Sequence, residues 1–170
     1  MKRVCVVLLV SWCLIFFSGL TWGQVTAVLF HAHSNFGFSE ALLTEHMDFL
    51  KESGYHTVTV AQFNQWYFNA APLPPRPIML TFDDNYIPVY DVAYPILKAR
   101  GQCAVNFTHT YYVGVVTGSG DHCDWDEIQE MEDAGVFYTE SHTRTHANLT
   151  SCNDATAWDE INGSDRKSVV

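Results

Sequence analysis

Short apolar runs alternate with amphipathic stretches along most of the chain. Runs rich in β-branched and aromatic residues predict five strands, at residues 25–30, 57–60, 78–82, 103–107 and 136–140. The first run is apolar throughout, which predicts a strand buried on both faces. The regular alternation of strands with helical stretches predicts an α/β fold with a parallel sheet, either open or closed into a barrel.

Apolar residues at helical spacing occupy the segments between these strands. The first helix is expected after Ser39, a candidate N-cap, and it should end at Gly54. Pro95 lies within the third helical segment and predicts a short or kinked helix there. The remaining helical segments are residues 61–68, 89–99, 124–134 and 155–161.

The number of these units limits the architecture. A strand and its helix need about thirty residues, so residues 24–170 hold roughly five units, as the five strand signals also indicate. A closed α/β barrel usually needs about 250 residues. The expectation is therefore one domain over residues 24–170 that is either an open sheet or the N-terminal part of a barrel. The chain ends within an expected helix, which favours truncation with the C-terminal part missing.

The N-terminus has the pattern of a secretory signal. Met1-Lys2-Arg3 precedes an apolar run from Val4 to Leu20, and small residues at cleavage-compatible positions follow. Residues 1–23 are therefore predicted to be a signal peptide, and the protein is expected to be secreted, periplasmic or part of the cell envelope. The alternative is that the segment remains as a membrane anchor.

Charge and cysteine content restrict the partners. Residues 24–170 contain seven basic and nineteen acidic side chains, a formal charge of −12. This charge argues against nucleic acid and polyanionic partners, and it is compatible with a neutral polymer. The segment keeps three cysteines, of which Cys123 and Cys152 are a candidate disulfide pair.

Candidate catalytic residues follow two of the predicted strands. Asp83 and Asp84 come directly after the apolar run 78–82, and His142 and His146 follow the run 136–140. Carboxyl ends of parallel strands meet at one edge of a sheet, where such folds build their sites. One carboxylate and two imidazoles four residues apart, on a helical turn or a tight loop, form a three-ligand metal site. The second carboxylate could then accept a proton from water at the metal, which predicts a metal-dependent hydrolase.

Each half of this pattern also has an ordinary explanation. Adjacent acidic residues often lie in a solvated loop or at a helix N-terminus, and a histidine pair is often a surface feature. His31 and His33 follow the first strand and would be either loop residues or part of a cleft rim. Trp66 and Trp125 would either pack against helices or stack on sugars. Only the combination of the two halves indicates a metal centre.

Both halves resemble motifs of a known family. Thr81-Phe82-Asp83-Asp84 and His142-Thr143-Arg144-Thr145-His146 are similar to the first and second motifs of polysaccharide deacetylases of the NodB-homology type, carbohydrate esterase family 4. The similarity extends over about residues 25–161. It implies a distorted (β/α)7 barrel. This chain would be truncated after about five of the βα units of that barrel.

The resemblance also implies roles for individual residues. Asp83 would be the catalytic base, and one divalent ion, usually zinc, would be held by Asp84, His142 and His146. The implied reaction removes acetyl groups from N-acetylglucosamine units of chitin, peptidoglycan or an exopolysaccharide, whereas some relatives remove O-acetyl groups from xylan.

The later motifs of the family would lie beyond Val170. They supply an arginine that orients the base, an aromatic groove wall and a histidine that protonates the leaving amine. The sequence therefore predicts a chain that binds metal and turns over poorly. Two alternatives are a small amide or ester hydrolase and a non-catalytic secreted sugar-binding domain.

Overall fold

The computed structural model describes residues 24–31 and 39–164. The predicted signal peptide lies outside these residues, as does His33. Within the described ranges no helix has the length and apolar character needed to cross a membrane.

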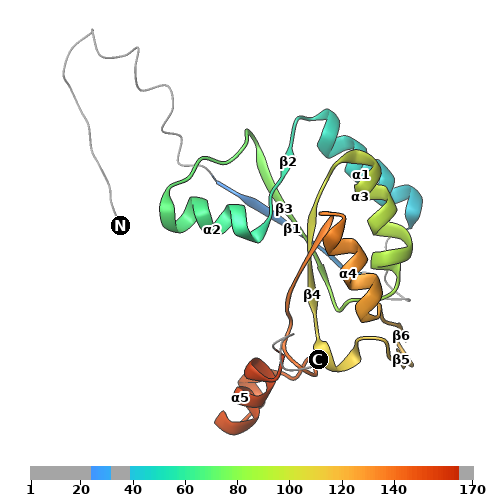
Figure 1. Cartoon of the computed structure of the whole chain (residues 1–170), viewed down its shortest axis with the longest axis vertical. Helices are drawn as coiled ribbons and strands as arrows, with labels where there is room; N and C mark the ends of the chain where they lie inside the picture. The colour runs from blue at the N-terminus through green and yellow to red at the C-terminus, as the bar shows by residue number, and fades with distance from the viewer. Residues whose placement is uncertain (1–23, 32–38, 165–170) are drawn as a thin grey trace, which may run out of the picture.

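A parallel five-stranded sheet organises the fold (Figure 1). Its order is β1-β3-β4-β7, and β2 pairs with the start of β3. Every pairing in this sheet is parallel, as predicted, and β1 and β7 form its two ends, so the barrel is not closed. The strands are β1 (Thr26–His31), β2 (His56–Thr57), β3 (Pro77–Asp83), β4 (Ala104–Thr108) and β7 (Phe137–Ser141).

In the described part of the chain, five α-helices connect and flank the strands, and most begin at a side-chain cap. Ser39 caps the first helix as predicted, and Asp124 forms a capping box with Glu127. The segment around Pro95 is a short α-helix preceded by a π-helical turn at Val89–Ala93, so the expected irregularity is confirmed. The helices are α1 (Glu40–Glu52), α2 (Val60–Asn69), α3 (Tyr94–Arg100), α4 (Trp125–Asp133) and α5 (Asp154–Asn162).

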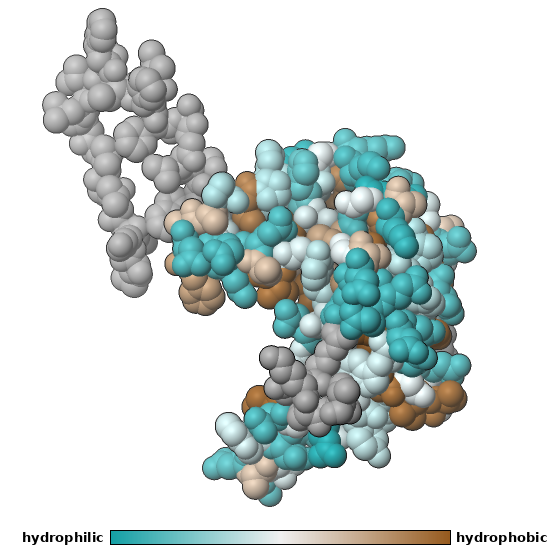
Figure 2. All heavy atoms as spheres, viewed as in Figure 1, coloured by the Kyte–Doolittle hydropathy of each residue, from teal (hydrophilic) through white to brown (hydrophobic). Residues whose placement is uncertain are grey.

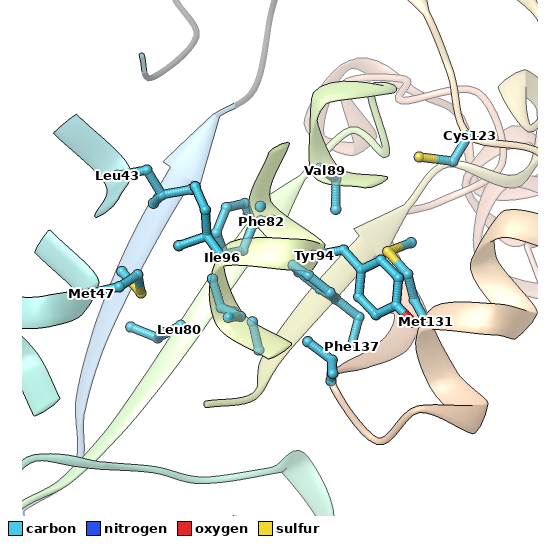
Figure 3. Packing of buried hydrophobic residues seen from close by; sticks show 14 of the residues in the cluster. Leu43, Met47, Leu80, Phe82, Val89, Tyr94, Ile96, Cys123, Met131 and Phe137 are labelled. Carbon is cyan, nitrogen blue, oxygen red and sulfur yellow. The ribbon is translucent and has the colours of Figure 1, made fainter. Parts of the chain in front are cut away.

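The hydrophobic core lies between the sheet and helices α1, α3 and α4 (Figures 1 and 3). Phe82 on β3 is fully buried, and its ring packs edge-on against Phe137 of β7 at a centroid distance of 5.2 Å. Leu43 and Met47 of α1 cover the same face. This packing fixes the end of β3, where the two aspartates are.

One prediction about burial was wrong. Strand β1 is not buried on both faces, because it lies at the end of the sheet and Leu29 remains 52% exposed. An apolar run is consistent with a half-covered edge strand as well as a central one, and the pattern alone does not separate the two.

The segment between β4 and α4, for which the sequence predicts neither a strand nor a helix, contains additional structure. A two-stranded antiparallel hairpin, β5 (Val116–Thr117) and β6 (Gly120–Asp121), follows a short 3₁₀ turn at Thr110–Tyr112. Figure 2 shows a mainly hydrophilic face with an apolar patch near this hairpin, where Val116 is 74% exposed.

The candidate disulfide is not formed. Cys103, Cys123 and Cys152 are all free thiols among the described residues. Cys123 is buried, with its thiol directed at the carbonyl oxygen of Tyr86, and burial raises its pKa to about 12. Cys152 instead contacts the carbonyl oxygen of Asn148.

Candidate metal centre

The two aspartates occupy a sharp turn at the carboxyl end of β3. Asp83 is the last residue of the strand, and Asp84 and Asn85 both adopt the left-handed conformation, with φ of 74° and 56°. This conformation is unfavourable for residues other than glycine and persists where surrounding contacts fix it. Here the Asp84 N–H donates to the carbonyl oxygen of Phe107, and the buried Asn85 side chain bridges Cys123 and Asn106.

The two histidines lie on a tight loop after β7, which resolves the choice between a loop and a helical turn. The His142 N–H donates to the carbonyl oxygen of Thr108 at 2.9 Å, which holds the start of the loop against β4. Thr143 and His146 have φ of 67° and 62°, and the hydroxyl of Thr143 accepts a hydrogen bond from the His146 N–H. These turns direct both imidazoles toward the aspartates.

Glu160 of α5 supports this loop from behind. Its side chain is almost fully buried and accepts hydrogen bonds from the N–H and the hydroxyl of Thr145, while its carbonyl oxygen accepts one from Arg144 N–H. Burial opposes ionisation of Glu160, but the hydrogen bonds from Thr145, Thr143 and Ala147 together outweigh it and lower the pKa of Glu160. The Arg144 side chain pairs with Asp159 of α5 at 2.7 Å.

Removing the Glu160 side chain should lower the metal affinity of the site, although Glu160 is not a proposed ligand. Replacing Glu160 with alanine leaves two donors of Thr145 without their acceptor, and we expect metal affinity to fall by about 10–100-fold, as for other groups that orient ligands. Competition with a chromophoric chelator measures this affinity. The control is Glu52→Ala on the exposed end of α1, which should leave the affinity unchanged. Unchanged metal affinity in the Glu160 variant would show that the loop keeps its conformation without Glu160.

The side chains converge on one carboxylate oxygen. Oδ1 of Asp84 lies 3.5 Å from Nε2 of His142 and 3.7 Å from Nε2 of His146, and the three ligand atoms all lie within 4.8 Å of one another. Ligands about 2.1 Å from a shared ion are about 3–3.5 Å apart, so a small contraction would suffice. Oδ1 of Asp84 is also buried without a hydrogen-bond partner, as expected for an atom that has a metal to bind. The residues therefore fit a divalent ion.

Asp83 is adjacent to the cluster of Asp84, His142 and His146 but is not a member of it. Its Oδ2 is 3.8 Å from Nε2 of His142, and the cluster of three ligand atoms does not include it. Burial raises the pKa of Asp83, and the neighbouring histidines partly counteract this effect. A partly desolvated carboxylate of this kind is suited to accepting a proton.

Sequence reasoning missed one imidazole. His109 is the first residue after β4, and its Nε2 lies 3.7 Å from Oδ1 of Asp84. The side chain is buried, and burial lowers its pKa to about 4, so the ring is neutral near pH 7. Its position shortly after the predicted strand at residues 103–107 was the available signal. His31, which the sequence placed either in a loop or on a cleft rim, also lies near the site. Its Nδ1 is 3.6 Å from Oδ2 of Asp84.

Both tryptophans make packing contacts in the structure. Trp125 begins α4 and packs partly buried against the core. Trp66 contacts the rings of Phe63 and Tyr67 on α2. Neither lies in the ligand cluster.

Comparison with known proteins places the chain in a family. The family model described as polysaccharide deacetylase matches residues 70–168, which include both motifs and more than half of the chain. The chain belongs to the polysaccharide deacetylase family. It is of the NodB type, as the two motifs indicated, and this family generally uses a divalent metal.

Similar proteins agree with this membership. The poly-β-1,6-N-acetyl-D-glucosamine N-deacetylase of Escherichia coli K12 is 40% identical over 57 residues, 34% of this chain and 8% of that protein. The protein of the same name from Staphylococcus aureus MRSA252 is 29% identical over 120 residues, 70% of this chain and 41% of that protein. The chain thus spans less than half the length of each of these relatives.

Solved structures of deacetylases share the fold. The Bacillus cereus polysaccharide deacetylase BC0361 superposes with a TM-score of 0.70 at 26% identity, over 85% of this chain and 46% of that one. The Streptococcus pyogenes deacetylase PplD superposes with a TM-score of 0.71 at 23% identity, over 82% and 64%. The open sheet of this family member therefore corresponds to part of the family barrel.

Proposed function

We propose that this chain carries the catalytic metal centre of a hydrolase that removes acetyl groups from N-acetylglucosamine units of a polysaccharide. The observation that supports the proposal most is the convergence of one carboxylate and two imidazoles, from two separate motifs, on Oδ1 of Asp84. The proposed ligands are Asp84, His142 and His146. Two nitrogen donors and one oxygen donor favour zinc.

Each residue of the cluster has a distinct proposed role. When bound, the divalent ion supplies Lewis acidity, which polarises a carbonyl and acidifies water. Asp83 accepts the proton of the attacking water at its carboxylate, since its pKa is raised and the group is within reach of the ligand cluster. His142 and His146 would each bind the ion through a ring nitrogen, and the turns at Thr143 and His146 hold both rings in orientation.

The substrate proposal rests on relatives and on charge. Two relatives carry the name of a poly-β-1,6-N-acetyl-D-glucosamine N-deacetylase, and we propose a polymer of this class as substrate. Such a polymer is neutral and gains amines on deacetylation, which suits the acidic chain. The substrate class also supports the proposal that the protein acts outside the cytoplasm.

Parallel acetate-release assays test the proposal. We expect the zinc-loaded chain to release more acetate from an oligomer of β-1,6-linked N-acetylglucosamine than from acetylated xylan or a small acetyl ester. Preference for xylan would instead indicate an O-acetyl esterase, and preference for the small ester a small-molecule hydrolase. If none of the three releases acetate and zinc does not bind, the chain is a non-catalytic domain.

A further inference from the structure

Among the described residues, four imidazoles lie next to the Asp84 carboxylate, and the proposed ligands account for two of them. Of the other two, His31 is half-exposed beside Oδ2, whereas His109 is buried and its Nε2 lies 3.7 Å from Oδ1, the oxygen proposed to bind the ion. We propose that His109 is a positioning residue that donates a hydrogen bond from Nε2 to Oδ1 of Asp84 and so orients this carboxylate toward the ion. The inference rests on the metal centre proposed above.

His109 differs from the proposed ligands in its contacts. The ligand atoms of Asp84, His142 and His146 all lie within 4.8 Å of one another, and His109 does not belong to this group. Its Nε2 is nevertheless as close to Oδ1 of Asp84 as Nε2 of His146 is. His109 therefore lies next to a ligand and outside the ligand set, and groups in such positions commonly hydrogen-bond a metal-binding carboxylate.

The buried polar atoms favour donation from Nε2. Oδ1 of Asp84 has lone pairs for both an ion and a donor, and it is buried without a hydrogen bond from any described residue. Nδ1 of His109 is also buried and has no hydrogen-bond partner in the described part of the chain. A neutral imidazole carries one proton. A proton on Nδ1 would be an unpaired buried N–H and would leave two lone pairs facing each other, at Nε2 and Oδ1. A proton on Nε2 avoids both costs.

A neutral donor suits a carboxylate that binds a cation. Burial disfavours the charged form of His109, and a divalent ion nearby disfavours it further. A lysine or arginine at this position would form an ion pair with Asp84 and repel the ion. A neutral N–H occupies one lone pair of Oδ1 and leaves the negative charge of the carboxylate for the ion.

A small movement of the carboxylate completes this hydrogen bond. An N–H···O bond is about 2.9 Å long, so the distance between Nε2 of His109 and Oδ1 has to shorten by about 0.8 Å. The ring centroids of His109, His142 and His146 lie within 6.5 Å of one another, so the three rings approach Oδ1 from the same side. One displacement of the carboxylate toward them shortens all three contacts.

Packing holds the ring of His109 in place. The ring packs edge-on against Tyr112 at a centroid distance of 4.9 Å and against His122 at 5.2 Å. The N–H of Tyr112 also donates to the carbonyl oxygen of His109 at 3.2 Å. A donor fixed at the end of β4 in this way can set the direction of a carboxylate on the turn after β3, because a preorganised group loses little entropy when it binds.

The proton on Nε2 is directly observable. Long-range proton–nitrogen correlation NMR on the zinc-loaded chain, with isotope-labelled histidine, distinguishes protonated, unprotonated and metal-bound ring nitrogens, and the spectrum of His109→Gln assigns the signals of His109. We expect His109 to carry its proton on Nε2 and none on Nδ1. A proton on Nδ1, or zinc bound to His109, would overturn the proposal and leave the proposed function standing. Absence of zinc uptake by the unaltered chain would overturn both.

Matched substitutions test the effect on the ion. His109→Gln keeps an N–H donor of similar reach, whereas His109→Leu has a similar size and no donor. Chelator competition should show a zinc affinity about 10–100-fold lower in His109→Leu and a smaller loss in His109→Gln. The control is His46→Leu on the exposed surface of α1, which should leave the affinity unchanged.

Rescue by glutamine distinguishes donation from packing. Equal losses of zinc affinity in the two His109 variants would show that the ring acts through packing alone, and an unchanged affinity in His109→Leu would show that it does not act on the ion. Either result would overturn the proposal. Circular dichroism verifies the fold of each variant, and the NMR measurement on the unaltered chain decides the question if His109→Leu does not fold.

Discussion

Replacing His142 with alanine is expected to reduce the zinc affinity of the chain by more than about 100-fold. His142 contributes one of only three proposed ligand atoms, and its Nε2 is the imidazole nitrogen nearest to Oδ1 of Asp84, at 3.5 Å. Loss of a ligand should exceed the 10–100-fold effect typical of groups that merely orient ligands. Chelator competition and zinc content after dialysis measure the change.

A histidine elsewhere on the surface provides the control for this variant. His46 is exposed on α1, and its replacement by alanine should leave zinc affinity unchanged. Circular dichroism verifies that both variants retain the fold. Zinc affinity in His142→Ala equal to that of the unaltered chain would mean that the ion binds elsewhere, and the proposed ligand set would be wrong.

Replacing Asp83 with asparagine is expected to lower acetate release by about 10²–10⁴-fold, the usual contribution of a general base. The change preserves the shape of the side chain and removes its ability to accept a proton. Because Asp83 is not one of the three clustered ligand atoms, zinc affinity should change little. The measurements are initial rates of acetate release and chelator competition on the same preparation.

The rate and the affinity together distinguish a base from a ligand. Asp126→Asn, on the exposed first turn of α4, is the matched control and should retain full activity. A large loss of zinc affinity in Asp83→Asn would make Asp83 a ligand, and an unchanged rate of acetate release would remove it from the mechanism.

The parallel sheet followed from the sequence because its signal is repetitive. Apolar runs separated by capped amphipathic helices leave few alternatives to βα units, and β3, β4 and β7 were all predicted within a residue or so of their bounds. The meeting of Asp84 with His142 and His146 followed from the same logic, because the carboxyl ends of parallel strands share one edge.

Features that depend on tertiary contacts could not be predicted from the sequence. The burial of β1 depends on which elements cover it, and its apolar sequence does not contain that information. The loop around Thr143 is left-handed at two residues, a conformation that Glu160 helps to hold from α5. The segment between β4 and α4 gives no strand signal in the sequence, because the short β5–β6 hairpin has too few residues to produce an alternating pattern.

His109 was missed for a related reason. A single histidine has no spacing partner, and its proximity to Asp84 arises from the pairing of β3 with β4, where Asp83 lies opposite Phe107. Only the sheet order reveals that the residue after β4 reaches the turn after β3. The disulfide prediction rested on the presence of three cysteines in a chain expected to be secreted, and this does not specify the distance between them. The structure places Cys123 and Cys152 in unrelated contacts.

The most direct test of the account is an anomalous difference map from a zinc-loaded crystal of the chain, recorded at the zinc absorption edge. The account predicts one strong peak about 2.0–2.2 Å from Oδ1 of Asp84 and from Nε2 of both His142 and His146, with the Asp83 carboxylate adjacent and not bound. A peak at other residues, or no peak at this edge of the sheet, would contradict the proposed metal centre.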